Sequence, residues 1–304
     1  MEHAVCLNTL SMPAQDKESA YNLMLEACYG MLELNDGNDR FSLYFDEMNK
    51  TIYECVLAEN YTYNDFLDDL QANQLMDLLL LLEEAEDKSP ALDYLNSDQF
   101  DELASYQFYL SGTGFDDVMD ILGIAWLIDG VLLSLATHER WEKTKVAVSR
   151  WDPHANREDR YFINNIAGEK NGIDIRNEIR ASAKRTLDDF CSQCIYTEEF
   201  RYWYNELNEN NRHRVASKIQ LADQRNFSGG EPLFKTLENA GGLRELRCSA
   251  YPGGAIRILF GPLPNNTRAI LIGFIKKSNV EGYGTNLDRA ELLWKKLSEK
   301  PESF

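Results

Sequence analysis

The sequence lacks the features that carry a chain out of the cytoplasm or into a membrane. Its first residues do not show a basic segment followed by an apolar one, the pattern of a secretory signal peptide. The most apolar stretch, residues 118–137, is interrupted by Asp120 and Asp129, and its uninterrupted part is shorter than the ~18 residues that a membrane span needs. We therefore expect a cytoplasmic protein without membrane contact, in which this stretch forms a buried central helix. Asp129 would then be a hydrogen-bonded core carboxylate or, alternatively, part of a site.

Motifs for metals and nucleotides are also missing. The six cysteines include one CxxC pair, Cys191 and Cys194, but a zinc site needs a second pair or matching histidines, and neither is near. The sequence shows no P-loop and no glycine-rich dinucleotide turn. We expect no metal, no cofactor and free thiols, with the CxxC pair on a helix that faces the core. A metal or redox role for this pair is the alternative.

Charge is spread unevenly along the chain, whose formal net charge is −19. Residues 196–304 contain 16 Lys and Arg against 13 Asp and Glu, a net charge of +3, which leaves −22 for residues 1–195. Nucleic acid is repelled by the first region and tolerated by the second. The first region is either an ordinary soluble acidic domain or a module that screens or mimics the polyanion sought by the basic region.

A length of 304 residues allows two domains. Helical periodicity at residues 17–33, an N-cap at Asn64 and further helical stretches predict a mainly helical acidic domain over residues 1–190. Residues 41–45 and 145–151 are strand candidates within it. We recognise no family and no repeat in this region, and its role as a sensor, a restraint or a partner-binding module stays open. Together with a small C-terminal domain over residues 191–304, this predicts an α+β protein of two domains.

The C-terminal region contains three runs of strand-forming residues, 243–250, 255–260 and 268–275. They are separated by Pro252-Gly253-Gly254 and by a second proline- and asparagine-rich break, which predicts an antiparallel meander. Helices are expected at residues 199–207 and 212–224, forming a helical hairpin on the sheet, and at residues 286–298.

The first two strands carry several charged residues. Because side chains alternate along a strand, Glu245 and Arg247 point to one face and Arg244 to the other. If Pro252-Gly253-Gly254 is the loop, Ser249 lies opposite Arg257, and Arg247 lies diagonal to Arg257 within reach of a shared anion. A slip of one residue would separate the two arginines.

Several short motifs point to a known family. They are TEEF-x-x-W-x-x-L at residues 197–207, GLRELR at 242–247, RILF at 257–260, GFIKK at 273–277 and an Ala-Glu-Leu-Leu helix near Ala290. In this order and spacing they resemble the RelE/ParE superfamily of toxins, most closely its phage-derived HigB-like branch. The resemblance covers the last third of the chain and gives no information about residues 1–190. It implies a RelE-like domain that cuts mRNA, often on the ribosome, or that poisons gyrase as ParE toxins do.

RNA cleavage without a metal uses the neighbouring 2′-hydroxyl as the nucleophile, so the protein must stabilise the phosphorane and move two protons. We expect Arg247 and Arg257 to hold the phosphate, because a guanidinium meets two phosphate oxygens and keeps its charge. Lys276 or Lys277, with a pKa lowered by neighbouring arginines, would transfer protons. The expected substrate-binding residues are Arg244, which steers RNA, Glu245, which is alternatively a base or a structural partner of arginine, and Phe274.

Two departures from the family pattern bear on the chemistry. Phe260 stands where a tyrosine is frequent, and Ile272 where a histidine is frequent, so acid–base chemistry is left to lysine. The alternative is a degenerate toxin fold, in which the arginines are solvated strand residues without a catalytic role.

The sequence thus predicts a toxin of a toxin–antitoxin-like or phage-defence system, acting as a metal-independent endoribonuclease. Its expected partners are RNA, with ribosome dependence left open, and either an antitoxin protein or its own N-terminal domain as inhibitor. Self-association is left open. The rival hypotheses are a non-catalytic protein that docks on the ribosome or on another protein, and a gyrase inhibitor.

Overall fold

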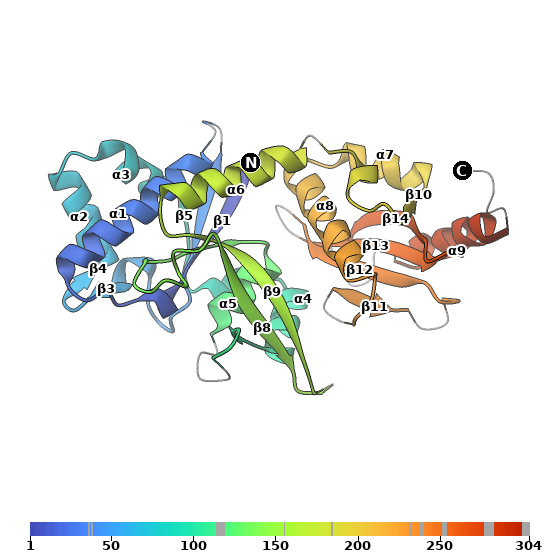
Figure 1. Cartoon of the computed structure of the whole chain (residues 1–304), viewed down its shortest axis with the longest axis horizontal. Coiled ribbons are helices and arrows are strands. Elements are labelled where there is room, and N and C mark those ends of the chain that lie inside the picture. Colours follow the sequence, from blue (N-terminus) through green and yellow to red (C-terminus); the bar gives the residue numbers. More distant parts are fainter. Residues whose placement is uncertain are drawn as a thin grey trace. The chain divides into compact units, whose positions relative to one another are not determined.

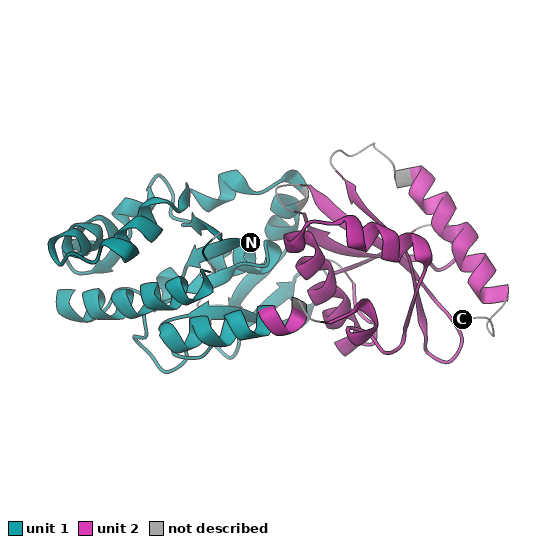
Figure 2. Cartoon of the chain, turned by 90° about the horizontal axis from the view of Figure 1, so that it is seen from above, with its two compact units in different colours: residues 1–179 teal, residues 180–304 magenta. Residues whose placement is uncertain are grey.

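The computed structural model describes residues 1–35, 37, 39–113, 119–154, 156–183, 185–230, 233–237, 240–250, 254–276 and 283–299. The chain divides into two compact units, Met1–Ile179 and Arg180–Phe304 (Figure 2). The division lies within helix α6 (Glu169–Ala183), earlier than the boundary after residue 190 suggested by the sequence. None of the helices in the described part of the chain has the length and apolarity needed to cross a bilayer.

The first unit is built on a seven-stranded sheet with the order β5-β2-β1-β7-β9-β8-β6. Strands β5, β1, β9 and β8 of this sheet are labelled in Figure 1. The five strands from β5 to β9 run parallel, and β8 and β6 continue the sheet antiparallel. The strands are β1 (Glu2–Leu7), β2 (Arg40–Tyr44), β5 (Glu86–Lys88), β6 (Gln107–Leu110), β7 (Val131–Leu133), β8 (Lys145–Asp152) and β9 (Arg157–Ile166). A separate hairpin consists of β3 (Val56–Ala58) and β4 (Tyr61–Thr62).

Helices cover the two faces of this sheet. They are α1 (Lys17–Leu34), α2 (Tyr63–Ala72), α3 (Met76–Glu83), α4 (Ser97–Ser105), α5 (Asp120–Leu127) and the first turns of α6. Alternation along β1 divides the core, because Val5 and Leu7 pack with α1, α2 and α3 whereas Cys6 packs with α4 and α5. Both faces of the central strands are therefore buried.

The prediction of a mainly helical first domain understates this sheet. Its two strand candidates, residues 41–45 and 145–151, correspond to β2 and β8, whereas the other five strands were not predicted. The apolar stretch expected as one central helix is α5 followed by β7, with a turn between them. Asp129 lies in that turn with φ +52° and is exposed, so it is not a core carboxylate. Short parallel strands buried on both faces are continuous apolar runs, and periodicity alone does not distinguish them from buried helices. The predicted Asn64 cap is also replaced, since Thr62 caps α2.

The second unit contains a five-stranded sheet with the order β10-β14-β13-β12-β11. The strands are β10 (Cys194–Tyr196), β11 (Phe234–Thr236), β12 (Arg244–Ser249), β13 (Ala255–Pro262) and β14 (Arg268–Lys276). The expected meander corresponds to β12, β13 and β14, and it is confirmed as antiparallel. The expected helices are present as α7 (Glu198–Glu206), α8 (Glu209–Gln224) and α9 (Tyr283–Glu299).

Two tryptophans bring helices close to this sheet. On the face covered by α7 and α8, a Cβ at Gly273 would lie only 2.0 Å from the Trp203 ring, so glycine is required there. On the other face, Trp294 of α9 lies over Gly261 and donates a hydrogen bond of 2.8 Å from Nε1 to the Pro262 carbonyl. The glycines allow the indoles to contact the backbone of the sheet directly.

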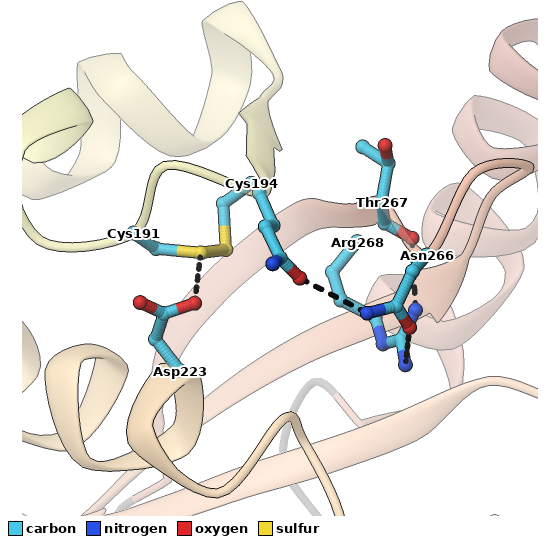
Figure 3. Close-up of a disulfide and its surroundings, with 7 residues drawn as sticks. Cys191, Cys194, Asp223, Asn266, Thr267 and Arg268 are labelled. Carbon is cyan, nitrogen blue, oxygen red and sulfur yellow. Dashed lines mark hydrogen bonds between the residues drawn. A yellow bond between two sulfur atoms is a disulfide. The ribbon is translucent and has the colours of Figure 1, made fainter.

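The CxxC pair differs from its prediction. Cys191 and Cys194 form a disulfide, and they lie in the turn that leads into β10 rather than on a helix (Figure 3). Asp223 of α8 has its Oδ1 atom 3.4 Å from Cys191 Sγ. Beside the disulfide, the amide of Asn266 donates to Gln193, which ties the same turn to the loop before β14. The remaining cysteines, Cys6, Cys28, Cys55 and Cys248, are not part of a disulfide and are buried.

Candidate functional site

The candidate site is the face of the second sheet on which four of the predicted residues meet. Arg247 of β12 lies directly opposite Arg257 of β13, and Arg257 lies directly opposite Phe274 of β14. Two residues away on the same strands, Ala255 of β13 lies opposite Lys276 of β14. Directly opposed residues point to the same side of a sheet. We call this surface, made by Arg247, Arg257, Phe274 and Lys276, the basic face.

The register differs from the expected one by two residues. Ser249 pairs with Ala255, where Arg257 was expected, and the amide of Ala250 donates a hydrogen bond of 3.0 Å to the Gly254 carbonyl. Arg247 therefore faces Arg257 directly and not diagonally. A shift of two residues preserves the direction of every side chain, which is why the two arginines still share a face. The expected Pro252-Gly253 turn residues lie outside the described part of the chain.

Glu245 is buried between the two arginines. Its Oε1 atom is 3.1 Å from Nε of Arg257 and 3.4 Å from Nε of Arg247, and the residue is 2% exposed. A carboxylate so enclosed is compensated by its cationic neighbours and has little surface left for a substrate. Of the two roles left open for Glu245, the geometry favours the structural one.

The predicted catalytic residues differ in how much of each side chain is exposed to solvent. Arg257 is 3% exposed, and its Nη1 donates 3.1 Å to the Ile256 carbonyl, whereas the Arg247 side chain retains 18% exposure. Lys276 is partly exposed at the end of β14. Phe274 packs on the cluster that α9 forms with the sheet. The second predicted lysine, Lys277, lies outside the described residues.

Arg244 does not belong to the basic face. Its guanidinium lies on the α7–α8 side, 4.8 Å from the centroid of the Phe234 ring, and donates to the carbonyls of Phe227 and Gly229. Burial, and to a smaller extent the charge of Arg268, lowers the pKa of Arg244. An arginine engaged in this way fixes a loop, so the structure does not place it where it would steer RNA to the other arginines.

Sequence reasoning missed a further cation beside the basic face. Arg214 of α8 donates 3.0 Å from Nη1 to the hydroxyl of Ser249, two residues beyond Arg247 on β12. This end of β12 extends past the last pairing with β11, so a helix side chain reaches it at the edge of the sheet. The only sequence signal was the basic run at residues 212–214. It does not reveal which helical side chain meets that edge.

The described residues contain no cluster of three or more His, Cys, Asp or Glu side chains that could hold a metal. Apart from the buried Glu245 carboxylate, the residues described above contribute guanidinium, ammonium, hydroxyl and aromatic groups. Such groups bind phosphate and transfer protons, and arginine is suited to the first task.

One comparison with known proteins bears on this site. Residues 202–295 match the family described as "Phage derived protein Gp49-like (DUF891)". The match runs from α7 into α9 and includes the whole basic face. Searches of curated proteins and of solved structures gave no match. The Gp49-like family is RelE/HigB-like, which is consistent with the resemblance noted for the C-terminal third.

Proposed function

We propose that the second unit is a RelE-like toxin domain that cleaves RNA on the basic face, without a metal. The observation that carries the proposal is the direct opposition of Arg247 and Arg257 next to Lys276 within the Gp49-like segment. Two guanidinium groups and an ammonium group, presented by neighbouring strands, form a site for a polyanionic substrate.

The proposed reaction is an internal transesterification. The 2′-oxygen attacks the adjacent phosphorus, the bond from phosphorus to the 5′-oxygen breaks, and the products are a 2′,3′-cyclic phosphate and a 5′-hydroxyl. One group accepts the proton of the 2′-hydroxyl and another protonates the 5′-oxygen that leaves. Lys276 is the described candidate for one transfer, and Lys277 is proposed from sequence for the other. Whether the RNA is cut on the ribosome is left to the experiment.

Because Arg247 and Arg257 differ in burial, we propose different roles for them. Arg247, the more exposed, would contact the phosphate and stabilise the phosphorane. Arg257 and Glu245 would act as positioning residues, because the shared carboxylate lies 3.4 Å from Nε of Arg247 and 3.1 Å from Nε of Arg257. Arg214 would extend the cationic surface along the RNA backbone.

The acidic first unit is proposed to restrain the toxin. Its charge has the sign of the substrate, so it would compete with RNA for cationic side chains. In a first alternative, a separately encoded antitoxin inhibits the toxin. In a second, the first unit senses a trigger that controls the toxin.

Induced expression of the full chain tests the proposal directly. We expect growth arrest and fragmented mRNA whose ends carry cyclic phosphate. Intact RNA in arrested cells would favour a non-catalytic docking protein, a rival supported by the burial of Arg257 and Glu245. Loss of DNA supercoiling without RNA cuts would instead indicate gyrase inhibition.

Substitution of Arg214 tests the extent of the RNA surface. Arg214→Ala removes one phosphate contact, so we expect weaker RNA binding at every sequence and a salt dependence whose slope falls by about 1. Arg212→Ala is the matched control, because it removes an exposed arginine two residues away on the same helix. Equal effects of the two substitutions would mean that only net charge matters.

A further inference from the structure

The CxxC motif has no part in the proposed function, and its two cysteines differ in burial. Cys191 is 2% exposed, whereas its disulfide partner Cys194 is half-buried at the start of β10. Thiol–disulfide exchange begins when a thiolate attacks one sulfur of a disulfide, and the rate depends on access to that sulfur. Of the two cysteines, Cys194 is therefore the one that an incoming thiol reaches more readily.

A carboxylate lies against the buried sulfur. Oδ1 of Asp223 is 3.4 Å from Sγ of Cys191 (Figure 3). Within the described part of the chain, the Asp223 carboxylate makes no other hydrogen bond and pairs with no lysine, arginine or histidine. The sulfur of Cys191 is thus the group that this carboxylate addresses.

The contact between Asp223 and Cys191 suits a thiol better than a disulfide. An ionised carboxylate only accepts hydrogen bonds, and a disulfide sulfur has no proton to donate, so the contact joins two acceptors in the oxidised form. A thiol at Cys191 would donate its proton to the same oxygen, and a hydrogen bond to an ionised acceptor is stronger than a neutral one. Asp223 therefore favours the dithiol over the disulfide.

The turn that carries the two cysteines is also held by contacts other than the disulfide. The amide of Cys194 donates 3.3 Å to the Cys191 carbonyl, and the amide of Arg268 donates 2.8 Å to the Gln193 carbonyl. Just before the turn, Phe190 is buried in the core of the second unit. These contacts keep the two sulfurs near each other in both redox forms, so the pair can open and close while the second unit stays folded.

We propose that Cys191 and Cys194 form a thiol–disulfide exchange site that reacts with a low-molecular-mass thiol. Cys194 is the sulfur that is attacked, and Asp223 is a positioning residue that accepts a hydrogen bond from the Cys191 thiol. The proposal is independent of RNA cleavage by the second unit.

The exchange consumes two molecules of the thiol. The first, as a thiolate, attacks Sγ of Cys194, the bond between the two protein sulfurs breaks, and Cys191 leaves as a thiolate that takes a proton from solvent. The second attacks the first at its sulfur in the mixed disulfide, and Cys194 is released and protonated. The protein gains two electrons and two protons, and the two thiols become one disulfide.

Equilibration of the folded full chain with mixtures of reduced and oxidised glutathione tests the proposal. Acid quenching, alkylation and mass spectrometry of the peptide that contains both cysteines report the fraction of disulfide. We expect this fraction to fall steadily as the share of reduced glutathione rises, with the circular dichroism of a folded protein throughout. A pair that stays oxidised in a large excess of reduced glutathione would be a structural cross-link and would overturn the proposal. A pair that stays reduced in excess oxidised glutathione would overturn it as well.

Substitution of Asp223 tests its role in the same equilibrium. Asp223→Asn removes the charged acceptor of the Cys191 thiol, so we expect the equilibrium constant for reduction by glutathione to fall about tenfold. The matched control is Glu209→Gln, which removes one exposed negative charge from the same helix and should leave the constant unchanged. Equal constants for the Asp223→Asn variant and the unaltered chain would contradict the role of Asp223.

A pair of single substitutions identifies the sulfur that is attacked. Both Cys191→Ser and Cys194→Ser lack the cross-link, so its loss affects the two variants alike. With oxidised glutathione, we expect Cys194 in the first variant to form a mixed disulfide about tenfold faster or more than Cys191 in the second. The reason is that burial and the neighbouring Asp223 carboxylate disfavour a thiolate at Cys191. Equal rates, or a faster reaction at Cys191, would show that the proposed order of attack is wrong.

Discussion

Both units place an arginine–carboxylate–arginine cluster on a β-sheet, and the two clusters have different surroundings. In the first unit Arg150 is 3% exposed and lies 2.8 Å from Asp159, which also binds the exposed Arg157. In the second unit Arg257 is 3% exposed and shares Glu245 with the more exposed Arg247. Each cluster thus combines a buried cation, a shared acid and an outer cation.

The neighbours of the outer cation distinguish the clusters. The strands around Arg157 contribute further acids, Asp152 and Glu158, and the buried Arg150 stacks 4.2 Å above the ring of Tyr106. Burial opposes ionisation of Asp159, yet hydrogen bonds and charge from Arg157 and Arg150 hold its pKa below the ordinary value. Around Arg247 the neighbours other than the shared Glu245 are cations and a phenyl ring. An ion-pair cluster is therefore no sign of function by itself, and the surrounding charge decides whether a polyanion can approach.

The largest expected effect compares the outer arginines. Arg247→Ala in the full chain should lower RNA cleavage by about 100-fold and abolish growth arrest, because a donor to the developing negative charge is lost. Arg157→Ala is the matched variant, since it removes the outer arginine of the equivalent cluster in the acidic unit. We expect it to leave cleavage unchanged. The readouts are RNA fragmentation and colony formation, and equal loss in both variants would refute the distinction between the clusters.

A second test asks whether the first unit restrains the second. Residues 180–304, produced alone and shown to be folded by circular dichroism, should arrest growth at about tenfold lower expression than the full chain, a typical coupling between domains. Equal toxicity of fragment and full chain would exclude intramolecular restraint and leave a separate antitoxin as the inhibitor.

The two units also differ in how much of them was predictable from sequence. The meander was found because Pro262, Pro264 and the asparagines mark a turn, and because the runs between the turns are rich in strand-forming residues. Strands β1 and β7 were missed, because short strands buried on both faces are continuous apolar runs and lack the alternation of polar and apolar residues that marks a strand. In the site, alternation placed Arg247 and Arg257 on one face. The burial of Glu245 and the approach of Arg214 depend on packing between distant segments, which spacing along the chain does not encode.

The next effect concerns the packing of α7 on the sheet. Gly273→Ala places a methyl group 2.0 Å from Trp203, so we expect a loss of roughly 1–3 kcal/mol from the free energy of unfolding through overpacking. Gly284→Ala on α9 is the control, because a Cβ there meets no atom within 4 Å. Urea denaturation measures both variants. Equal stability of the Gly273→Ala and Gly284→Ala variants would mean that the Trp203 side chain moves aside at little energetic cost.

The disulfide in the second unit gives a smaller effect. Cys191→Ala combined with Cys194→Ala removes a short cross-link, and the loop-entropy estimate gives a loss of about 2 kcal/mol or less. Thiol titration of the unfolded chain without reductant should detect four groups, Cys6, Cys28, Cys55 and Cys248. Detection of six would mean that the CxxC pair is reduced in the isolated protein.

The smallest effect is that of a surface ion pair that joins α7 to α9. Arg289 donates through Nε to both Glu199 oxygens at 3.0 and 3.1 Å, and this hydrogen bonding lowers the pKa of Glu199 from its ordinary 4.5. Because the folded-state pKa is depressed, the stabilisation is complete above pH 4.5 and is lost as the pH falls through the lower folded value. Both side chains are over 40% exposed, so Glu199→Gln should cost at most about 1 kcal/mol at pH 7, with high salt reducing the cost. The unaltered chain and the variant should converge in stability once the pH is well below the folded-state pKa of Glu199, and a difference that persists there would mean that Glu199 acts through packing and not through charge.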